Sequence, residues 1–126
     1  MGTTVRVLIA DDRSRSRQGL RALLGTHPGI EVVGEARDGL EALRLVEERH
    51  PHAVLMDAKM PIMNGLAAAH FIKERWPEVK IIVLTMYDSL QAAALDAGAD
   101  AFLIKGCPAS ELLGAIASPD EAIDGP

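Results

Sequence analysis

The stretch VRVLIADD (residues 5–12) decides the fold, because a mostly apolar run of six residues stops there at two adjacent aspartates, Asp11 and Asp12. Short apolar runs of this kind are typical of buried β-strands. Four further runs follow along the chain, at residues 30–33, 53–56, 81–84 and 101–104. Three of these also end at a polar residue, namely Asp57, Thr85 and Lys105. Polar chemistry is therefore predicted at the same end of four of the five strands.

The segments between these runs have helical spacing, so strands and helices alternate along the chain. The predicted helices cover residues 14–24, 40–48, 65–75, 89–97 and 110–117. Apolar strands with little polar alternation indicate a sheet covered on both faces, hence parallel and doubly wound. We expect an α/β fold of the flavodoxin-like type, with a five-stranded parallel sheet in the order 2-1-3-4-5. Helix ends are predicted from residue type: Ser14, Ser89 and Ser110 as N-terminal caps, and Gly98 as a helix terminator.

Length and composition indicate one ordinary globular domain. The chain has 126 residues, of which 48% are apolar and 25% charged. We assign residues 1–117 to the domain and interpret the polar residues 118–126 as a tail or linker. The single cysteine, the lack of an apolar run of membrane-spanning length and the lack of a signal peptide predict a cytoplasmic protein with no membrane partner.

Charge argues against a nucleic-acid-binding surface on this domain. The formal net charge is -5, whereas phosphate backbones are bound by concentrated Lys and Arg. One local exception is the basic stretch Arg13, Arg15, Arg17 and Arg21. We interpret it as the solvated face of a helix.

The polar strand ends predict a metal and phosphate site. In the strand order above, the first and third strands are neighbours, which brings Asp57 beside Asp11 and Asp12. Two carboxylates about 5 Å apart repel by roughly 3 kcal/mol at an effective dielectric near 20, so the trio needs a proton or a cation. Oxygen ligands without Cys or His at ligand spacing favour Mg2+, or Mn2+, over zinc. Asp57 is then a candidate nucleophile toward phosphorus, with the Thr85 hydroxyl and the Lys105 ammonium as phosphate partners.

Taken together, these motifs resemble the receiver domain of bacterial two-component response regulators. The resemblance extends over about residues 5–117. Its motifs are Ala10-Asp11-Asp12, Leu55-Met56-Asp57, Met60-Pro61, Asn64-Gly65, Leu84-Thr85, Ala97-Gly98-Ala99 and Phe102-Leu103-Ile104-Lys105. The stretch Thr85-Met86-Tyr87-Asp88 is similar to the NarL, FixJ or LuxR type, whose receivers precede a helix-turn-helix domain.

The resemblance implies roles for the acidic residues. Asp57 would accept a phosphoryl group from a phosphohistidine of a sensor histidine kinase, or from a small donor such as acetyl phosphate. Asp12 and Asp57 would bind Mg2+ directly, together with the backbone carbonyl of Lys59. Asp11 would act on the metal mostly through water.

The resemblance also implies a switch and its partners. Thr85 would move toward the new phosphate, and Phe102 would turn inward, although an aromatic residue in a strand is also an ordinary core residue. The output surface would be helix 4, strand 5 and helix 5, and a homodimer through that surface or helix 1 is compatible with this scheme. The domain would be a phosphoacceptor rather than an enzyme. It would reach DNA, and so control transcription, only through a helix-turn-helix domain that these 126 residues lack.

Two other classes of function use similar residues. Hydrolases of the haloacid-dehalogenase type also combine an aspartyl phosphate, Mg2+, a Thr or Ser and a Lys. Their nucleophile motif has two aspartates spaced by one residue, whereas Asp11 and Asp12 are adjacent and Asp57 is central. A pseudo-receiver would bind partners without phosphorylation, which the presence of all five site residues argues against.

Overall fold

Five parallel strands form one sheet in the order β2-β1-β3-β4-β5 in the computed structural model, which describes residues 4–117. This confirms the predicted fold class. The strands are β1 (Val5–Ala10), β2 (Ile30–Ala36), β3 (Ala53–Met56), β4 (Lys80–Thr85) and β5 (Ala101–Ile104). The helices are α1 (Ser14–Leu24), α2 (Gly39–Arg49), α3 (Gly65–Arg75), α4 (Gln91–Asp96) and α5 (Ala109–Ala117), with a 3-10 turn η1 (Asp88–Leu90) before α4. The tail assigned to residues 118–126 lies outside the described residues.

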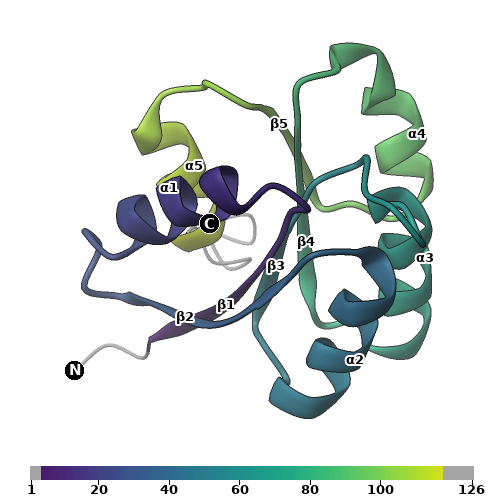
Figure 1. Cartoon of the computed structure of the whole chain (residues 1–126), viewed down its shortest axis with the longest axis horizontal. Helices are drawn as coiled ribbons and strands as arrows, with labels where there is room; N and C mark the ends of the chain where they lie inside the picture. The colour runs from purple at the N-terminus through teal and green to yellow at the C-terminus, as the bar shows by residue number, and fades with distance from the viewer. Residues whose placement is uncertain (1–3, 118–126) are drawn as a thin grey trace, which may run out of the picture.

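The sheet separates two apolar cores. Helices α1 and α5 cover one face, and α2, α3 and α4 cover the other (Figure 1). Successive residues of a strand point to opposite faces, so Leu8 and Val54 belong to the core under α2 and α3, while Val7 and Leu55 belong to the core under α1 and α5. Burial of each such side chain contributes about 1.5–3 kcal/mol.

Three elements, α2, β4 and α5, differ from their predicted bounds by one residue at one or both ends, and two others differ by more. Strand β2 runs three residues beyond the predicted end at residue 33, because the pairing register with β1 shifts between Val7 and Leu8, which face Val32 and Gly34. A bulge of this kind lets a strand continue past a residue pattern that looks like its end. The fourth helical segment begins as the 3-10 turn η1 and becomes α-helical only at Gln91.

The helix caps are partly different from those predicted. Ser14 and Ser89 lie inside α1 and η1, and neither caps its element, since the N-cap positions are Arg13 and Tyr87 without a side-chain hydrogen bond. The prediction for Ser110 is also wrong, because α5 begins one residue earlier, at Ala109. Asp38 and Asn64 do cap their helices: the Asp38 side chain accepts Glu41 N–H before α2, and the Asn64 side chain accepts Ala67 N–H before α3.

Gly98 ends α4, as predicted. It has a positive φ of 102°, and its N–H donates to Leu95 O while Ala99 N–H donates to Ala94 O. This pair of hydrogen bonds is a Schellman motif, which needs a residue in the left-handed region after the helix. Within residues 4–117, no helix is both long and apolar enough to span a membrane.

Candidate functional site

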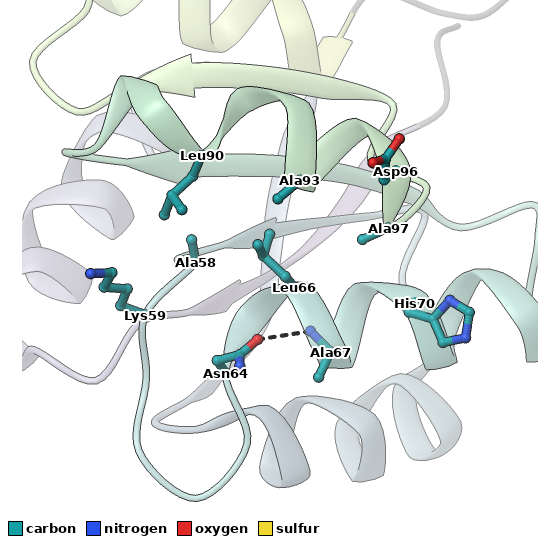
Figure 2. A pocket seen from close by; sticks show the side chains of 10 residues that line it. All are labelled: Ala58, Lys59, Asn64, Leu66, Ala67, His70, Leu90, Ala93, Asp96 and Ala97. Atoms are coloured by element: carbon teal, nitrogen blue, oxygen red, sulfur yellow. Dashed lines mark hydrogen bonds between the residues drawn. The ribbon is translucent and has the colours of Figure 1, made fainter.

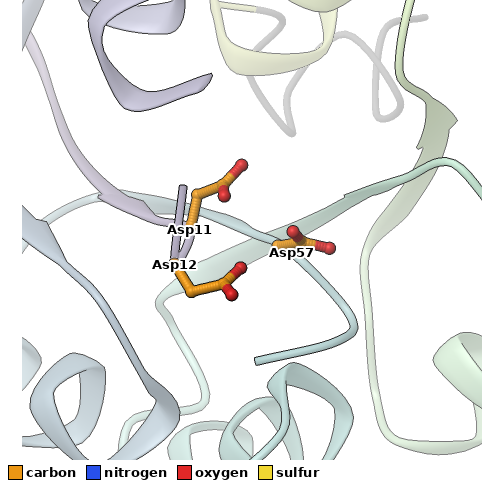
Figure 3. Close-up of side chains that lie close together, drawn as sticks. All are labelled: Asp11, Asp12 and Asp57. Carbon is orange, nitrogen blue, oxygen red and sulfur yellow. The ribbon is translucent and has the colours of Figure 1, made fainter. Parts of the chain in front are cut away.

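The register of β1 and β3 places Asp11 beside Asp57. Ala10 pairs with Met56 at the ends of the two strands, and Asp57 N–H donates to Ala10 O at 2.9 Å. Asp12 follows at the next position, so each of the three aspartates offers a carboxylate oxygen to the same place (Figure 3). These oxygens all lie within 4.8 Å of one another.

Asp11 is the most enclosed of the three carboxylates. Its Oδ1 accepts Arg13 N–H at 2.9 Å, and its Oδ2 accepts both Ser16 Oγ at 2.5 Å and Lys105 Nζ at 2.8 Å. Burial acts to raise the pKa of Asp11, but the hydrogen bonds from Lys105, Ser16 and Arg13 outweigh it and lower the pKa below its usual value. Asp11 is therefore a buried anion whose charge is compensated by the protein.

For Asp57 the effects that raise the pKa outweigh the hydrogen bonds that lower it. Its Oδ2 accepts Lys105 Nζ at 3.2 Å and its Oδ1 accepts Lys59 N–H at 3.3 Å, both longer than the bonds to Asp11. Burial raises the pKa of Asp57, the Lys105 charge opposes this, and the Asp11 charge adds to it, so that the net shift is upward. A carboxylate that is buried, negatively charged and weakly paired favours a cation beside it.

Lys105 links the two buried carboxylates from the end of β5. Lys105 N–H donates to Thr85 O at 2.8 Å, which fixes the residue beside β4, and its side chain is 18% exposed. Burial acts to lower the pKa of Lys105, but the hydrogen bond to Asp11 and the charges of Asp57 and Asp11 raise it. The ammonium stays charged and within reach of any group bound to Asp57.

The remaining predicted residues lie around this cluster. Thr85 is fully buried at the end of β4, and its hydroxyl accepts Tyr87 N–H at 3.3 Å; within residues 4–117 it makes no hydrogen bond to the aspartates. Phe102 is half-buried and packs against the core under α2, α3 and α4. Lys59 is exposed, and its side chain lies over the Tyr87 ring at 4.3 Å, a cation–π contact that sequence reasoning did not predict.

Two glycines let the loop after β3 approach its neighbours. A Cβ at Gly65 would lie 1.8 Å from Asp57 O, and a Cβ at Gly39 would lie 2.4 Å from Met63 O. Gly39 N–H donates to Met63 O at 2.9 Å, so the loop is attached to the start of α2. The backbone around Asp57 is thus fixed by close contacts on both sides.

A cavity of about 240 Å³ opens over the carboxylates. It is lined by Asp12, Arg13, Asp57, Lys59, Met86, Tyr87 and Lys105. Asp12 is exposed and accepts no hydrogen bond within the described range 4–117, so its oxygens are available to a ligand. The position suits a small charged ligand held between the acidic cluster and the Lys105 ammonium.

A second, larger hollow lies away from the acidic cluster. The groove between α3 and α4 has a volume of about 570 Å³; Leu66 extends into it from α3, and Ala93 and Ala97 line its other side (Figure 2). Its lining is mainly apolar, and it offers none of the carboxylates described above. The residues predicted to form the metal and phosphate site line the smaller cavity instead.

The donor set fits a hard divalent cation. The cluster offers carboxylate oxygens only, and two of its members have free acceptor positions. Burial raises the pKa of Asp57 and the negative charge of Asp11 adds to this, so a cation beside Asp57 would stabilise its ionised form. Mg2+ and Mn2+ prefer such ligands and keep several waters, which the open cavity accommodates.

Ser16 and Arg17 belong to this site, although the sequence interpretation did not include them. Arg17 donates to Asp11 O at 2.7 Å and pairs with Glu35, and its side chain is only 13% exposed. The prediction that the basic stretch is a solvated helix face is therefore wrong for Arg17. The available signal was position: a residue five or six places after Asp11 lies in the first turn of α1, directly above the end of β1.

A parallel sheet in this order with three acidic residues and one lysine at its carboxyl end defines a receiver-type α/β domain. Residues 7–117 match the response regulator receiver domain, and the chain belongs to that family.

Relatives and solved structures agree with this assignment. The uncharacterized transcriptional regulatory protein YhcZ of Bacillus subtilis (strain 168) is 45% identical over 111 residues, which cover 86% of this chain and 52% of that protein. A LuxR-family two-component response regulator from Aurantimonas sp. SI85-9A1 is 35% identical, with a TM-score of 0.86 and coverage of 96% of this chain and 85% of that one.

The signal receiver domain of the putative response regulator NarL from Mycobacterium tuberculosis has a TM-score of 0.85 at 28% identity, and covers 99% of this chain and 100% of that one. The relatives are response regulators of the NarL and LuxR type, as the sequence motifs predicted. The chain spans about half the length of the curated relatives it matches.

Proposed function

We propose that this chain is the phosphoacceptor part of a transcriptional response regulator, and that Asp57 takes a phosphoryl group from a sensor histidine kinase. The observation that carries the proposal is the position of Lys105, whose ammonium contacts both Asp11 and Asp57 inside a cluster of three carboxylates. An acyl phosphate on Asp57 would carry negative charge on its phosphoryl oxygens, which the Lys105 ammonium and a metal ion held by the carboxylates would stabilise.

Different residues of the chain would bind the metal, attack the phosphorus and pair with the phosphoryl group. Asp12 and Asp57, with the backbone carbonyl of Lys59, would hold Mg2+, and Asp11 would contact the metal through water. The bound ion supplies positive charge that neutralises phosphoryl oxygens. The Asp57 carboxylate forms the new O–P bond while the P–N bond of the donor phosphohistidine breaks, and the imidazole leaves with the electron pair. Lys105 pairs with a phosphoryl oxygen.

The signal would be transmitted through Thr85 and Phe102. Within the part of the chain that the structure describes, the Thr85 hydroxyl makes a single long hydrogen bond, to Tyr87 N–H, so little would be lost when it turns toward a phosphoryl oxygen. Phe102, which packs at the edge of its core, would follow, and the surface formed by α4, β5 and α5 would change its contacts. Residues 1–117 would form this receiver, a homodimer would use one of its helical faces, and DNA would be bound by an effector domain outside these 126 residues.

Phosphorylation by acetyl phosphate tests the proposal. With Mg2+, intact-mass spectrometry is expected to show the addition of one phosphoryl group to the wild-type protein. Neither Asp57→Asn nor the wild type in EDTA should gain that mass. Asp88→Asn is the matched control, because Asp88 is an exposed acid outside the cluster. Modification that persists in Asp57→Asn, or its absence from the wild type with acetyl phosphate and with a phosphorylated kinase, would contradict the proposal.

A further inference from the structure

One oxygen of Asp11 has two protein donors. Oδ2 accepts Ser16 Oγ at 2.5 Å and Lys105 Nζ at 2.8 Å, and a carboxylate oxygen has two lone pairs, so both are used. The Asp11 side chain is 2% exposed, which keeps bulk water from replacing a lost donor. If Lys105 moves away, the Ser16 hydroxyl is the donor that remains on this oxygen.

Ser16 is placed for this contact by α1. It is the third residue of the helix and half-buried, where a serine would ordinarily bond to nearby backbone or solvent. Here it donates across to the strand end instead, while its neighbour Arg17 donates to the backbone oxygen of the same aspartate at 2.7 Å. The first turn of α1 therefore holds both ends of Asp11 by bonds that do not involve Lys105.

The Lys105 ammonium also contacts a second carboxylate, that of Asp57. It already contacts Asp57 Oδ2 at 3.2 Å, and a phosphoryl group on Asp57 would add negative charge at that side. Its closer contact with Asp11 must then lengthen or break. A buried carboxylate that loses a charged donor is destabilised, because the cost of burying the charge is no longer compensated.

We propose that Ser16 is a positioning residue, which keeps the Asp11 carboxylate in place when Lys105 turns to a phosphoryl group on Asp57. This inference rests on the phosphoacceptor function proposed above. Ser16 touches neither the phosphoryl group nor the metal, and it acts by keeping Asp11 hydrogen-bonded in both states. Its hydrogen bond contributes more once Lys105 has left Oδ2 and Ser16 is the donor that remains there, and it therefore lowers the cost of the phosphorylated arrangement relative to the unphosphorylated one.

Calorimetric binding of beryllofluoride, a phosphoryl analogue, tests the inference on the full chain with Mg2+ present. Ser16→Ala is expected to bind beryllofluoride about tenfold more weakly, since a hydrogen bond to a charged group changes an equilibrium by at least that factor. Ser16→Thr keeps the hydroxyl and should restore binding; the side chain borders a cavity of about 260 Å³ that has room for the added methyl group.

Two comparisons separate this role from a structural one. Ser14→Ala is the matched control, because Ser14 is exposed in the same turn of α1 and its side chain has no hydrogen bond within residues 4–117; it should bind beryllofluoride as the wild type does. Binding of Mg2+ alone, without beryllofluoride, should change less than about twofold in Ser16→Ala, since Lys105 is not drawn away.

The possible results are distinct. Equal beryllofluoride affinity in Ser16→Ala and wild type would overturn the inference and leave the phosphoacceptor function intact. So would failure of folded Ser16→Thr to restore binding, or an equal weakening of Mg2+ alone and of beryllofluoride in Ser16→Ala. A wild-type protein that binds no beryllofluoride with Mg2+ would overturn both the inference and the proposed function.

Discussion

Replacing Gly65 with alanine should disturb both the stability and the metal site of this protein. The added Cβ would lie 1.8 Å from Asp57 O and 2.9 Å from Met56 Cγ, whereas non-bonded heavy atoms prefer about 3.5 Å or more. The start of α3 must retreat by more than about 1 Å. That movement breaks the hydrogen bond from Gly65 N–H to Ala58 O, which is 2.9 Å long, and strains the Asn64 cap. Overpacking at about 1–3 kcal/mol and a lost hydrogen bond at about 1 kcal/mol give a loss of about 2–4 kcal/mol.

Urea denaturation followed by circular dichroism measures this loss, and calorimetry measures Mg2+ affinity in the same variant. The affinity should fall, because the added Cβ also pushes against Asp57 O and so shifts the backbone that carries the Asp57 carboxylate. Gly114→Ala is the control: its Cβ meets nothing within 4 Å in the exposed middle of α5, so the variant should be about 0.5–1 kcal/mol more stable than the wild type, with Mg2+ binding unchanged. A Gly65→Ala protein within 0.5 kcal/mol of the wild type, on the order of a neutral surface change, would refute the reasoning.

Three further substitutions have expected outcomes. Asp57→Asn should stabilise the metal-free protein at pH 7, because burial raises the pKa of Asp57 and its ionised form therefore destabilises the fold. This gain in the free energy of unfolding should shrink as the pH falls toward 3.8, the usual pKa of the group. A gain that is independent of pH in urea denaturation series would contradict the reasoning. Glu35→Gln should destabilise the protein at neutral pH, since the hydrogen bond from Arg21 lowers the pKa of Glu35. The loss in the free energy of unfolding is fully present above pH 4.5 and should disappear as the pH falls through the lowered pKa of the folded state. A loss that grows in acid would be inconsistent with the pairing. Gly98→Ala should lower stability by about 1–2 kcal/mol in thermal or urea unfolding, because its φ of 102° disfavours a side chain; an unchanged midpoint would argue that α4 ends differently.

The fold can be predicted from the sequence because each apolar run is a buried strand and the polar residue after it lies at the carboxyl end of that strand. Parallel strands bring their carboxyl ends to one edge, so Asp11, Asp57 and Lys105 could be placed together before any coordinates were known. Strand β2 shows where this reasoning stops. Its bulge is a matter of pairing with β1, and the residues Gly34 and Glu35 carry no local pattern that announces it.

The contacts within the site were less predictable. The sequence indicates which residue types meet, but not that Asp11 is compensated by three donors while Asp57 is held by two longer bonds. That difference depends on side-chain geometry across elements far apart in the chain. The caps illustrate the same limit: Ser14 is a good cap by residue type, yet the helix begins one residue too early for it to serve.

The division of the interior by the sheet has a consequence for how this protein can vary. The apolar side chains beneath α1 and α5 and those beneath α2, α3 and α4 form two separate clusters, connected through the strands that carry both. Each helical layer can therefore accumulate its own compensating substitutions, and the cost of changes in one layer should add to the cost of changes in the other. At the edge where Asp11, Asp57 and Lys105 meet, a substitution affects residues attached to both layers, and we expect few substitutions to be tolerated there.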